Sequence, residues 1–188
     1  ASAMPRRAVF AAATSLLAVP PAFAAGKPAS DGSWAKRFEA FEDSDFAGFK
    51  TAPSGLQYKV FEEGYGVKPV AGQKIKAHYA GYLLNGAKFD SSYDRRSPLE
   101  FNVGTGRVIK GWDEALLDMQ VGEKRILKIP SGLACESNAR LEHRSECALM
   151  LTMRVCLCLP ADGEKGAGGI IPGGATLVFY VELVTLAA

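Results

Sequence analysis

Residues 108–124, with the sequence VIKGWDEALLDMQVGEK, hold the strongest information about the fold. Trp112, Ala115 and Leu116 recur at helical spacing, so this stretch predicts one short helix over residues 111–119 that opens at a glycine. Residues 123–129 follow with the composition and length of a strand. The stretch therefore predicts a helix that leads directly into a strand.

Further strands are predicted on both sides of this helix. Apolar residues alternate with polar ones from Leu56 to Val60, up to a turn near residues 64–66, and other strands are expected at 74–84, 99–103 and 175–184. Twenty glycines and ten prolines agree with many turns. About five strands and one central helix make an α+β domain. The sheet must then bury one face against that helix.

Two local features refine this outline. Asn85-Gly86 directly follows the strand expected at 74–84 and predicts a type I′ hairpin turn, in which both residues have positive φ. Before the first strand, Trp34, Phe38 and Phe41 recur at helical spacing. We expect a short amphipathic helix over residues 33–49 that packs on the domain, with Asp31 or Ser33 available as its N-cap.

The N-terminal residues 1–25 are interpreted as an export signal and are set apart from the fold. Arg6 and Arg7 precede an apolar run of about a dozen residues, which is too short to span a bilayer as a helix. Ala22-Phe23-Ala24 is a small-x-small cleavage motif, so we expect cleavage after Ala24. The paired arginines resemble a twin-arginine signal, which bacterial and thylakoid translocases recognise. Residues 26–52 would then form a linker and the short helix.

Charge and cysteine content narrow the class of protein. The 188-residue chain has a formal net charge of +2, which gives no argument for binding nucleic acid or an anionic membrane surface. Its four cysteines lie within one short stretch, at positions 135, 147, 156 and 158. Only Cys156 and Cys158 are close, and His143 has no partner histidine nearby, so the spacing does not favour a zinc site. A disulfide within the stretch stays open.

Several motifs together resemble the FKBP-type peptidyl-prolyl cis-trans isomerases. VIKGWD at 108–113 and MQVGEK at 119–124 resemble the central signature of that family. HYAG at 78–81 and KFDSS at 88–92 resemble its earlier motifs, and GAGGIIP at 166–172 and ATLVF at 175–179 resemble its C-terminal ones. The resemblance assigns residues 53–188 to the domain, apart from 135–162. It implies an FKBP-like twisted antiparallel β-sheet wrapped around one short α-helix, in agreement with the pattern above.

The resemblance also implies an activity, the acceleration of rotation about X-Pro peptide bonds. The expected partners are proline-containing polypeptide clients and macrolide inhibitors of the FK506 type. No cofactor, metal, nucleic acid or stable membrane insertion is implied. Rotation about the amide needs no nucleophile, because an aromatic cleft can bind the twisted amide better than the planar one.

The family pattern assigns roles to individual residues. Trp112 would form the floor of the proline pocket, with Tyr79, Phe89, Val108, Ile109 and Phe179 on its walls and Leu99 where the family often has phenylalanine. Asp90 would accept or orient a hydrogen bond near the twisted carbonyl, and Arg95 would pair with Asp90 or support Tyr79. The Ile109 N–H would hold a substrate carbonyl. Ile170 and Ile171 belong to the loop that closes over the cleft. Taken singly, these residues would be ordinary core or surface positions, and their joint spacing makes them a candidate site.

One segment departs from the family pattern. After Ala134 the family continues with a tyrosine whose hydroxyl bonds a ligand carbonyl, whereas here residues 135–162 intervene. Two explanations stay open: a translated intron, or a real lid or partner-binding loop held by a disulfide. An intron would favour a eukaryotic plastid, and hence the thylakoid lumen, over a bacterial periplasm. Position 1 is alanine, which agrees with a piece of a longer precursor.

Three functions therefore remain in competition. The first is a prolyl isomerase that assists the folding of exported proteins, and it is favoured by Trp112, Phe89 and Asp90. The second is a non-catalytic FKBP-like chaperone or assembly module, and it is favoured by the missing tyrosine. The third is a non-functional isoform that exists when residues 135–162 are present.

Overall fold

The computed structural model describes residues 30–134 and 171–187 of the chain. The expected export signal, the segment 135–162 with its cysteines, and Ile170 all lie outside the described residues.

Across the described residues, seven strands form one antiparallel sheet. Six of them lie in the order β1 (Lys50–Thr51), β2 (Gln57–Glu62), β6 (Lys124–Ile129), β7 (Leu177–Leu186), β3 (Lys74–Leu83) and β4 (Lys88–Ser91), and β5 (Leu99–Asn102) also pairs with β3. The five expected strands are confirmed. The two additional strands, β1 and β4, are too short for their alternation to distinguish them from turns.

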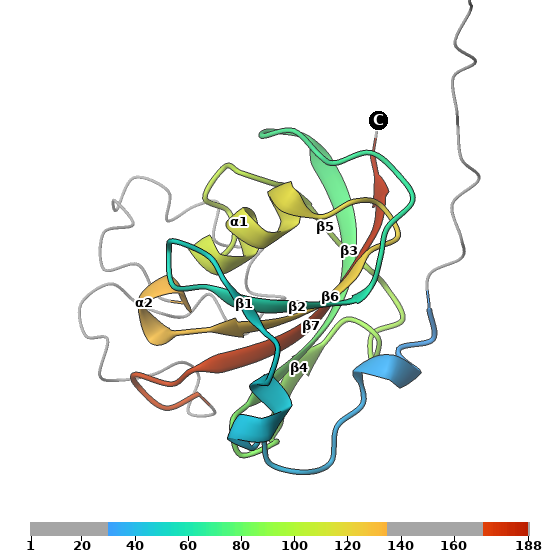
Figure 1. Ribbon diagram of the computed structural model, residues 1–188. Helices are drawn as coiled ribbons and strands as arrows, with labels where there is room; N and C mark the ends of the chain where they lie inside the picture. The colour runs from blue at the N-terminus through green and yellow to red at the C-terminus, as the bar shows by residue number, and fades with distance from the viewer. Residues whose placement is uncertain (1–29, 135–170, 188) are drawn as a thin grey trace, which may run out of the picture.

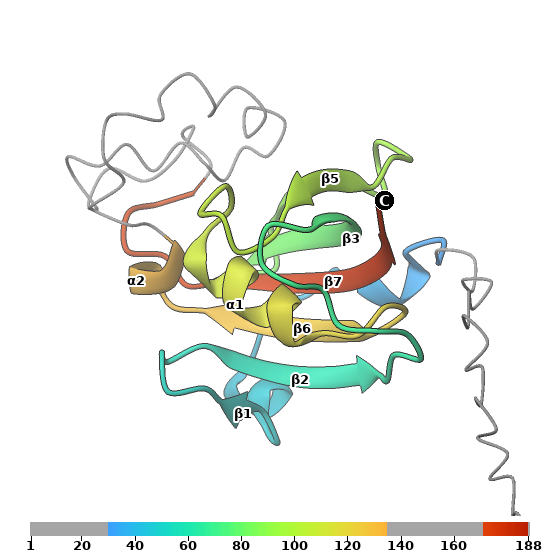
Figure 2. The ribbon, with the colours of Figure 1, turned by 90° about the horizontal axis from the view of Figure 1, so that it is seen from above.

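A single nine-residue helix, α1 (Lys110–Asp118), covers one face of this sheet, and the short α2 (Ser131–Ala134) lies beside its N-terminal end. Figures 1 and 2 show the sheet curving around α1. The helix buries Trp112, Ala115 and Leu116 on the sheet side, as their spacing predicted. They pack with alternate residues of the central strands, including Leu127, Ile129, Phe179 and Val181. The expected α+β architecture is therefore confirmed.

The hairpin between β3 and β4 differs from the prediction. Gly86 has a φ of 81°, but Asn85 is not among the residues with positive φ, which a type I′ turn requires. The Gly86 N–H donates to the Leu83 carbonyl at 2.9 Å, and Ala87 N–H donates to the side chain of Asn85 at 3.0 Å. The loop is thus one residue longer than a two-residue hairpin, and glycine alone takes the left-handed conformation.

The prediction of an amphipathic helix at 33–49 is wrong, but the segment packs on the domain as expected. The chain forms two short 3-10 turns, η1 (Ser33–Ala35) and η2 (Asp43–Phe46). Backbone groups that a helix would pair internally are instead bonded to β3 and to the turn that follows it. The Tyr82 hydroxyl donates to the Ala35 carbonyl at 2.8 Å, and the Phe41 N–H donates to the Leu84 carbonyl at 2.8 Å.

This N-terminal segment covers the face of the sheet opposite α1 (Figure 1). Trp34 stacks on Phe61 at 5.3 Å and meets the ring of Tyr180 edge-on at 5.5 Å. Phe38, which was expected to anchor the helix, is 91% exposed. The sheet is therefore covered on both faces. Among the described residues, no helix has the length and apolar character needed to cross a membrane.

Candidate functional site

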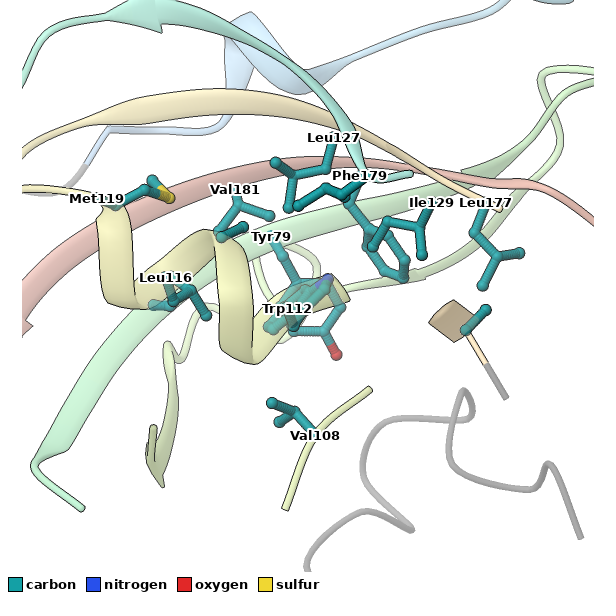
Figure 3. Close-up of a cluster of buried hydrophobic side chains, with 14 of the residues drawn as sticks. Tyr79, Val108, Trp112, Leu116, Met119, Leu127, Ile129, Leu177, Phe179 and Val181 are labelled. Atoms are coloured by element: carbon teal, nitrogen blue, oxygen red, sulfur yellow. The ribbon is translucent and has the colours of Figure 1, made fainter. Parts of the chain in front are cut away.

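Four aromatic rings, on β3, β4, α1 and β7, gather where α1 meets the sheet. Figure 3 shows Trp112 pointing from α1 towards Tyr79 and Phe179 on the central strands. The Trp112 ring lies edge-on to Tyr79 at 5.1 Å and to Phe179 at 5.2 Å, and Phe89 lies edge-on to Phe179 at 5.5 Å. Edge-to-face contacts at these distances are favourable between aromatic rings. We call Tyr79, Phe89, Trp112 and Phe179 the aromatic cluster, and all four were expected in the site.

Trp112 lies at the base of this cluster. Its side chain is fully buried, and its Nε1 forms no hydrogen bond with the described residues. A buried donor without a partner is uncommon in folded proteins, because its lost hydration is not replaced. Its burial next to the rings of Tyr79 and Phe179 places it in an apolar, aromatic environment.

A glycine makes room for two of the rings. Gly81 on β3 is paired with Phe179 on β7, and it lies two residues after Tyr79 on the same face of the strand. A side chain at this position would meet the rings of Phe89 and Phe179. The HYAG motif therefore supplies both a ring at Tyr79 and the space for its neighbours.

Beside the aromatic cluster, Tyr79, Asp90 and Arg95 form a closed hydrogen-bonded triangle. The Tyr79 hydroxyl donates to Asp90 Oδ2 at 2.5 Å and accepts from Arg95 Nη2 at 2.6 Å. Arg95 Nη1 also donates to Asp90 Oδ1, and the guanidinium lies over the Tyr79 ring at 5.5 Å from its centre. Arg95 thus both pairs with Asp90 and supports Tyr79, which were the two roles considered for it.

Strand pairing brings the members of the triangle together. Asp90 on β4 is opposite Gly81 on β3, so it is a diagonal neighbour of Tyr79. Burial raises the pKa of the Tyr79 phenol, and the Asp90 carboxylate raises it further, while Arg95 opposes both. The phenol therefore keeps its proton at neutral pH, and that proton is directed at Asp90.

The expected substrate-binding residues surround this arrangement at different depths. Val108 and Ile171 are buried, whereas Leu99 and Ile109 are half-buried and pack against the same core. Ile109 is the N-cap of α1, and its N–H forms no hydrogen bond with the described residues. Its expected bond to a substrate carbonyl stays a prediction. Ile170 cannot be placed in the same way, because it lies outside the described residues.

Sequence reasoning missed two contributors to the site. Phe101 on β5 is buried with its ring centre 6.3 Å from that of Trp112. Its alternation with Leu99 along one strand face was the signal that could have identified it. Asp113 follows Trp112 and accepts from the N–H groups of Gly104 and Gly106, at 2.8 and 2.9 Å. It fixes the loop that leads to Val108 and Ile109.

This combination of one short helix, an aromatic cluster and a Tyr–Asp–Arg triangle agrees with a known family. The family described as FKBP-type peptidyl-prolyl cis-trans isomerase matches residues 66–184. The chain is 43% identical over 131 residues to FK506-binding protein 1A of Neurospora crassa, which covers 69% of this chain and 87% of that protein. The chain belongs to the FKBP-type peptidyl-prolyl cis-trans isomerases.

Other relatives of this FKBP-type isomerase agree. The chain is 45% identical over 119 residues to peptidyl-prolyl cis-trans isomerase FPR2 of Saccharomyces cerevisiae, which covers 63% of this chain and 68% of that protein. It is also similar to the crystal structure of AtFKBP13, with a TM-score of 0.57 and 38% identity over 75% of this chain and all of that one. The expected fold and enzyme class are therefore confirmed.

Proposed function

We propose that this FKBP-type isomerase accelerates X-Pro rotation by binding the proline ring against the aromatic cluster, with its peptide carbonyls held at the rim. One observation carries the proposal: the Tyr79–Asp90–Arg95 triangle lies directly beside the buried Trp112 ring. An apolar surface thus lies next to fixed polar groups. A twisted amide could bind its proline ring to the first and its carbonyl to the second.

The physical basis is differential binding of the twisted amide. Amide resonance gives rotation about a peptide bond a barrier of roughly 18–20 kcal/mol. A site that binds the twisted state more tightly than the planar state lowers this barrier. The apolar rings would favour the less polar, twisted amide by replacing water around it. The Ile109 N–H would hold a carbonyl of the substrate, and Asp90 and Arg95 would fix the Tyr79 hydroxyl beside the rotating bond.

The test is an isomerisation assay with a short X-Pro peptide and the whole chain, followed by NMR exchange so that no protease is added. We expect clear acceleration, which Asp90→Ala and Phe89→Ala each reduce strongly. Phe38→Ala is the matched control, because this residue is 91% exposed and lies in the segment that covers the face of the sheet opposite α1. A folded wild-type protein without acceleration would refute the proposal.

A macrolide of the FK506 type is proposed as a ligand of the same surface. The support is the set of relatives named FK506-binding protein, together with the aromatic cluster retained here. FK506 should then inhibit the isomerisation and shift the NMR signals of Trp112. Binding that survives Trp112→Leu unchanged would place the macrolide elsewhere.

A non-catalytic binding module is the second candidate, because Cys135 stands where the family pattern has a ligand-binding tyrosine. The assay separates the two candidates directly. FK506 or peptide binding without acceleration would favour the binding module. Sequencing of the mature transcript would show whether residues 135–162 belong to the protein, and a message without them would identify a translated intron.

For the location we propose the thylakoid lumen, with the bacterial periplasm as the alternative, and exported proteins as clients. The support is the sequence of residues 1–25, with Arg6-Arg7 before an apolar run and Ala22-Phe23-Ala24 after it. Residues 1–30 fused to a reporter should be imported by isolated thylakoids and cleaved after Ala24. Import that continues when both arginines are replaced by lysines would contradict a twin-arginine route.

A further inference from the structure

We propose that Ser92 is a positioning residue of the isomerase, which holds the Tyr79 phenol in line with Asp90 and Arg95. The inference rests on the proposed function, since it takes Tyr79 to face the substrate. Ser92 itself is fully buried and lies just beyond the end of β4. It therefore acts on the reaction through Tyr79.

Ser92 binds both peptide groups of Tyr79. The Ser92 N–H donates to the Tyr79 carbonyl at 3.0 Å, which continues the β3–β4 pairing by one residue. The Ser92 hydroxyl accepts from the Tyr79 N–H at 2.8 Å and lies 3.2 Å from the Tyr79 carbonyl as a donor. A side chain thus takes over a role that a strand partner normally fills. It fixes the backbone from which the Tyr79 ring extends.

The same serine begins the loop that returns Arg95 to Tyr79. The Ser97 N–H donates to the Ser92 carbonyl at 3.3 Å, so the loop closes on itself. Within it Arg96 has a φ of 54°, a conformation that is uncommon outside glycine and that a constrained turn imposes. Ser92 therefore anchors both partners of the Arg95–Tyr79 contact.

His78 supports Ser92 from the opposite side. Its Nδ1 lies 2.9 Å from the Ser92 hydroxyl oxygen, and its ring stacks on Tyr93 at 4.6 Å. A hydroxyl has one donor and two acceptor sites. All three contacts of the Ser92 hydroxyl are satisfied when His78 carries a proton on Nδ1, which directs the serine proton to the Tyr79 carbonyl. This tautomer is inferred from the hydrogen-bond network.

Ser91 offers a matched control, since it is also a buried serine at the same strand end. Its hydroxyl accepts from the Tyr93 N–H at 3.2 Å and forms no hydrogen bond with Tyr79 among the described residues. Ser91→Ala and Ser92→Ala therefore remove the same atom from neighbouring buried positions. The proposal predicts that Ser92→Ala lowers kcat/KM, whereas Ser91→Ala leaves it nearly unchanged.

The experiment is a double-mutant cycle on the whole chain, with kcat/KM for an X-Pro peptide as the readout and urea unfolding in parallel. Ser92→Ala should lower kcat/KM by about tenfold, because misplacing a reacting group by an ångström can cost up to about a hundredfold. In a Tyr79→Phe background the same change should cost less than about twofold, since the hydroxyl it positions is gone. Ser91→Ala should change kcat/KM by less than about twofold in either background. Ser92→Cys, similar in size, replaces Ser92→Ala if the latter does not fold.

Equal losses for Ser92→Ala in both backgrounds would overturn the proposal and leave Ser92 a structural residue. The same conclusion would follow if Ser91→Ala and Ser92→Ala had the same effect. If the wild type showed no isomerisation at all, the proposed function would fail. Crystal structures of the wild type and Ser92→Ala would then decide the positioning role, because an unchanged Tyr79–Asp90 hydrogen bond overturns it.

Discussion

A Cβ atom on Gly81 would lie 2.5 Å from Cζ of Phe89, closer than packed carbon atoms approach one another. It would also lie 2.9 Å from Cε1 of Phe179, so both rings occupy space that the missing side chain leaves open. Phe89 and Phe179 contact each other edge-on at this point. The arrangement of the aromatic cluster therefore depends on glycine at this position of β3.

Gly81→Ala should displace Phe89 and Phe179 and reduce isomerase activity. Forcing a methyl group into a packed core costs about 1–3 kcal/mol of stability, and we expect a value in that range from urea unfolding. Gly132→Ala is the control, because a Cβ there meets nothing within 4 Å and the residue lies in α2. If both variants kept full kcat/KM and stability, the rings would not need the space at Gly81.

Asp113→Ala should loosen the loop that leads to Val108 and Ile109. Its carboxylate accepts the N–H groups of Gly104 and Gly106. These groups can turn to water in the variant, so the expected loss of stability is about 1–2 kcal/mol. Substrate binding should weaken as well, because the Ile109 N–H is no longer held in place. The measurements are KM for an X-Pro peptide and the urea midpoint.

Glu114→Ala tests whether the effect of Asp113 is local. Glu114 is the next residue of α1, and its carboxylate accepts from the exposed Ser54 hydroxyl at 2.8 Å. KM should stay near the wild-type value in this variant. An equal rise of KM in both variants would mean that removing either acidic residue from the N-terminal half of α1 weakens binding.

The sequence predicted best where side-chain spacing follows one regular period. Trp112, Ala115 and Leu116 face the sheet because helical spacing places them on one side of α1. The same spacing predicted a helix wrongly for Trp34, Phe38 and Phe41, because tertiary contacts bind that backbone instead of helical hydrogen bonds. The Tyr82 hydroxyl and the Leu84 carbonyl satisfy that backbone, and they lie about 40 residues or more further along the chain. No local pattern could have indicated them.

The candidate site was likewise predicted only in part from the sequence. Motif resemblance located Tyr79, Asp90 and Arg95, and their joint geometry agrees with the expectation. It gave no role to Ser92, because a serine in a motif looks like any polar residue at a strand end. The contact of its hydroxyl with the peptide groups of Tyr79 depends on strand register, which the sequence did not specify.

The stability of the protein should fall below about pH 6.5 through His78. Burial lowers the pKa of His78 from its usual value of 6.5, and the neighbouring Glu182 opposes this shift. The unfolded chain then binds more protons at this residue than the native state does. The contribution of His78 to the free energy of unfolding is therefore fully present above about pH 6.5, and it decreases as the pH falls below that value.

His78→Gln removes this titration and gives the measurement its reference. Urea unfolding of both proteins at about pH 7.5 and about pH 5.5 should show a larger loss of stability for the wild type. All other titratable groups are the same in both proteins, so their contributions cancel in the comparison. A loss that is equal in the two proteins, or larger in His78→Gln, would contradict the direction of the shift.

Trp34→Ala and Phe38→Ala compare two aromatic residues that the sequence placed on the same helix face. Trp34 stacks on Phe61, and its Nε1 donates to the Tyr93 hydroxyl at 3.1 Å, so its loss should destabilise the protein by about 2 kcal/mol. Phe38 is 91% exposed, and its replacement should change stability by less than about 0.5 kcal/mol. Urea unfolding of the two variants measures the difference. Equal destabilisation would support an amphipathic helix with both rings packed on the sheet, whereas the observed 3-10 turns require the effects to separate.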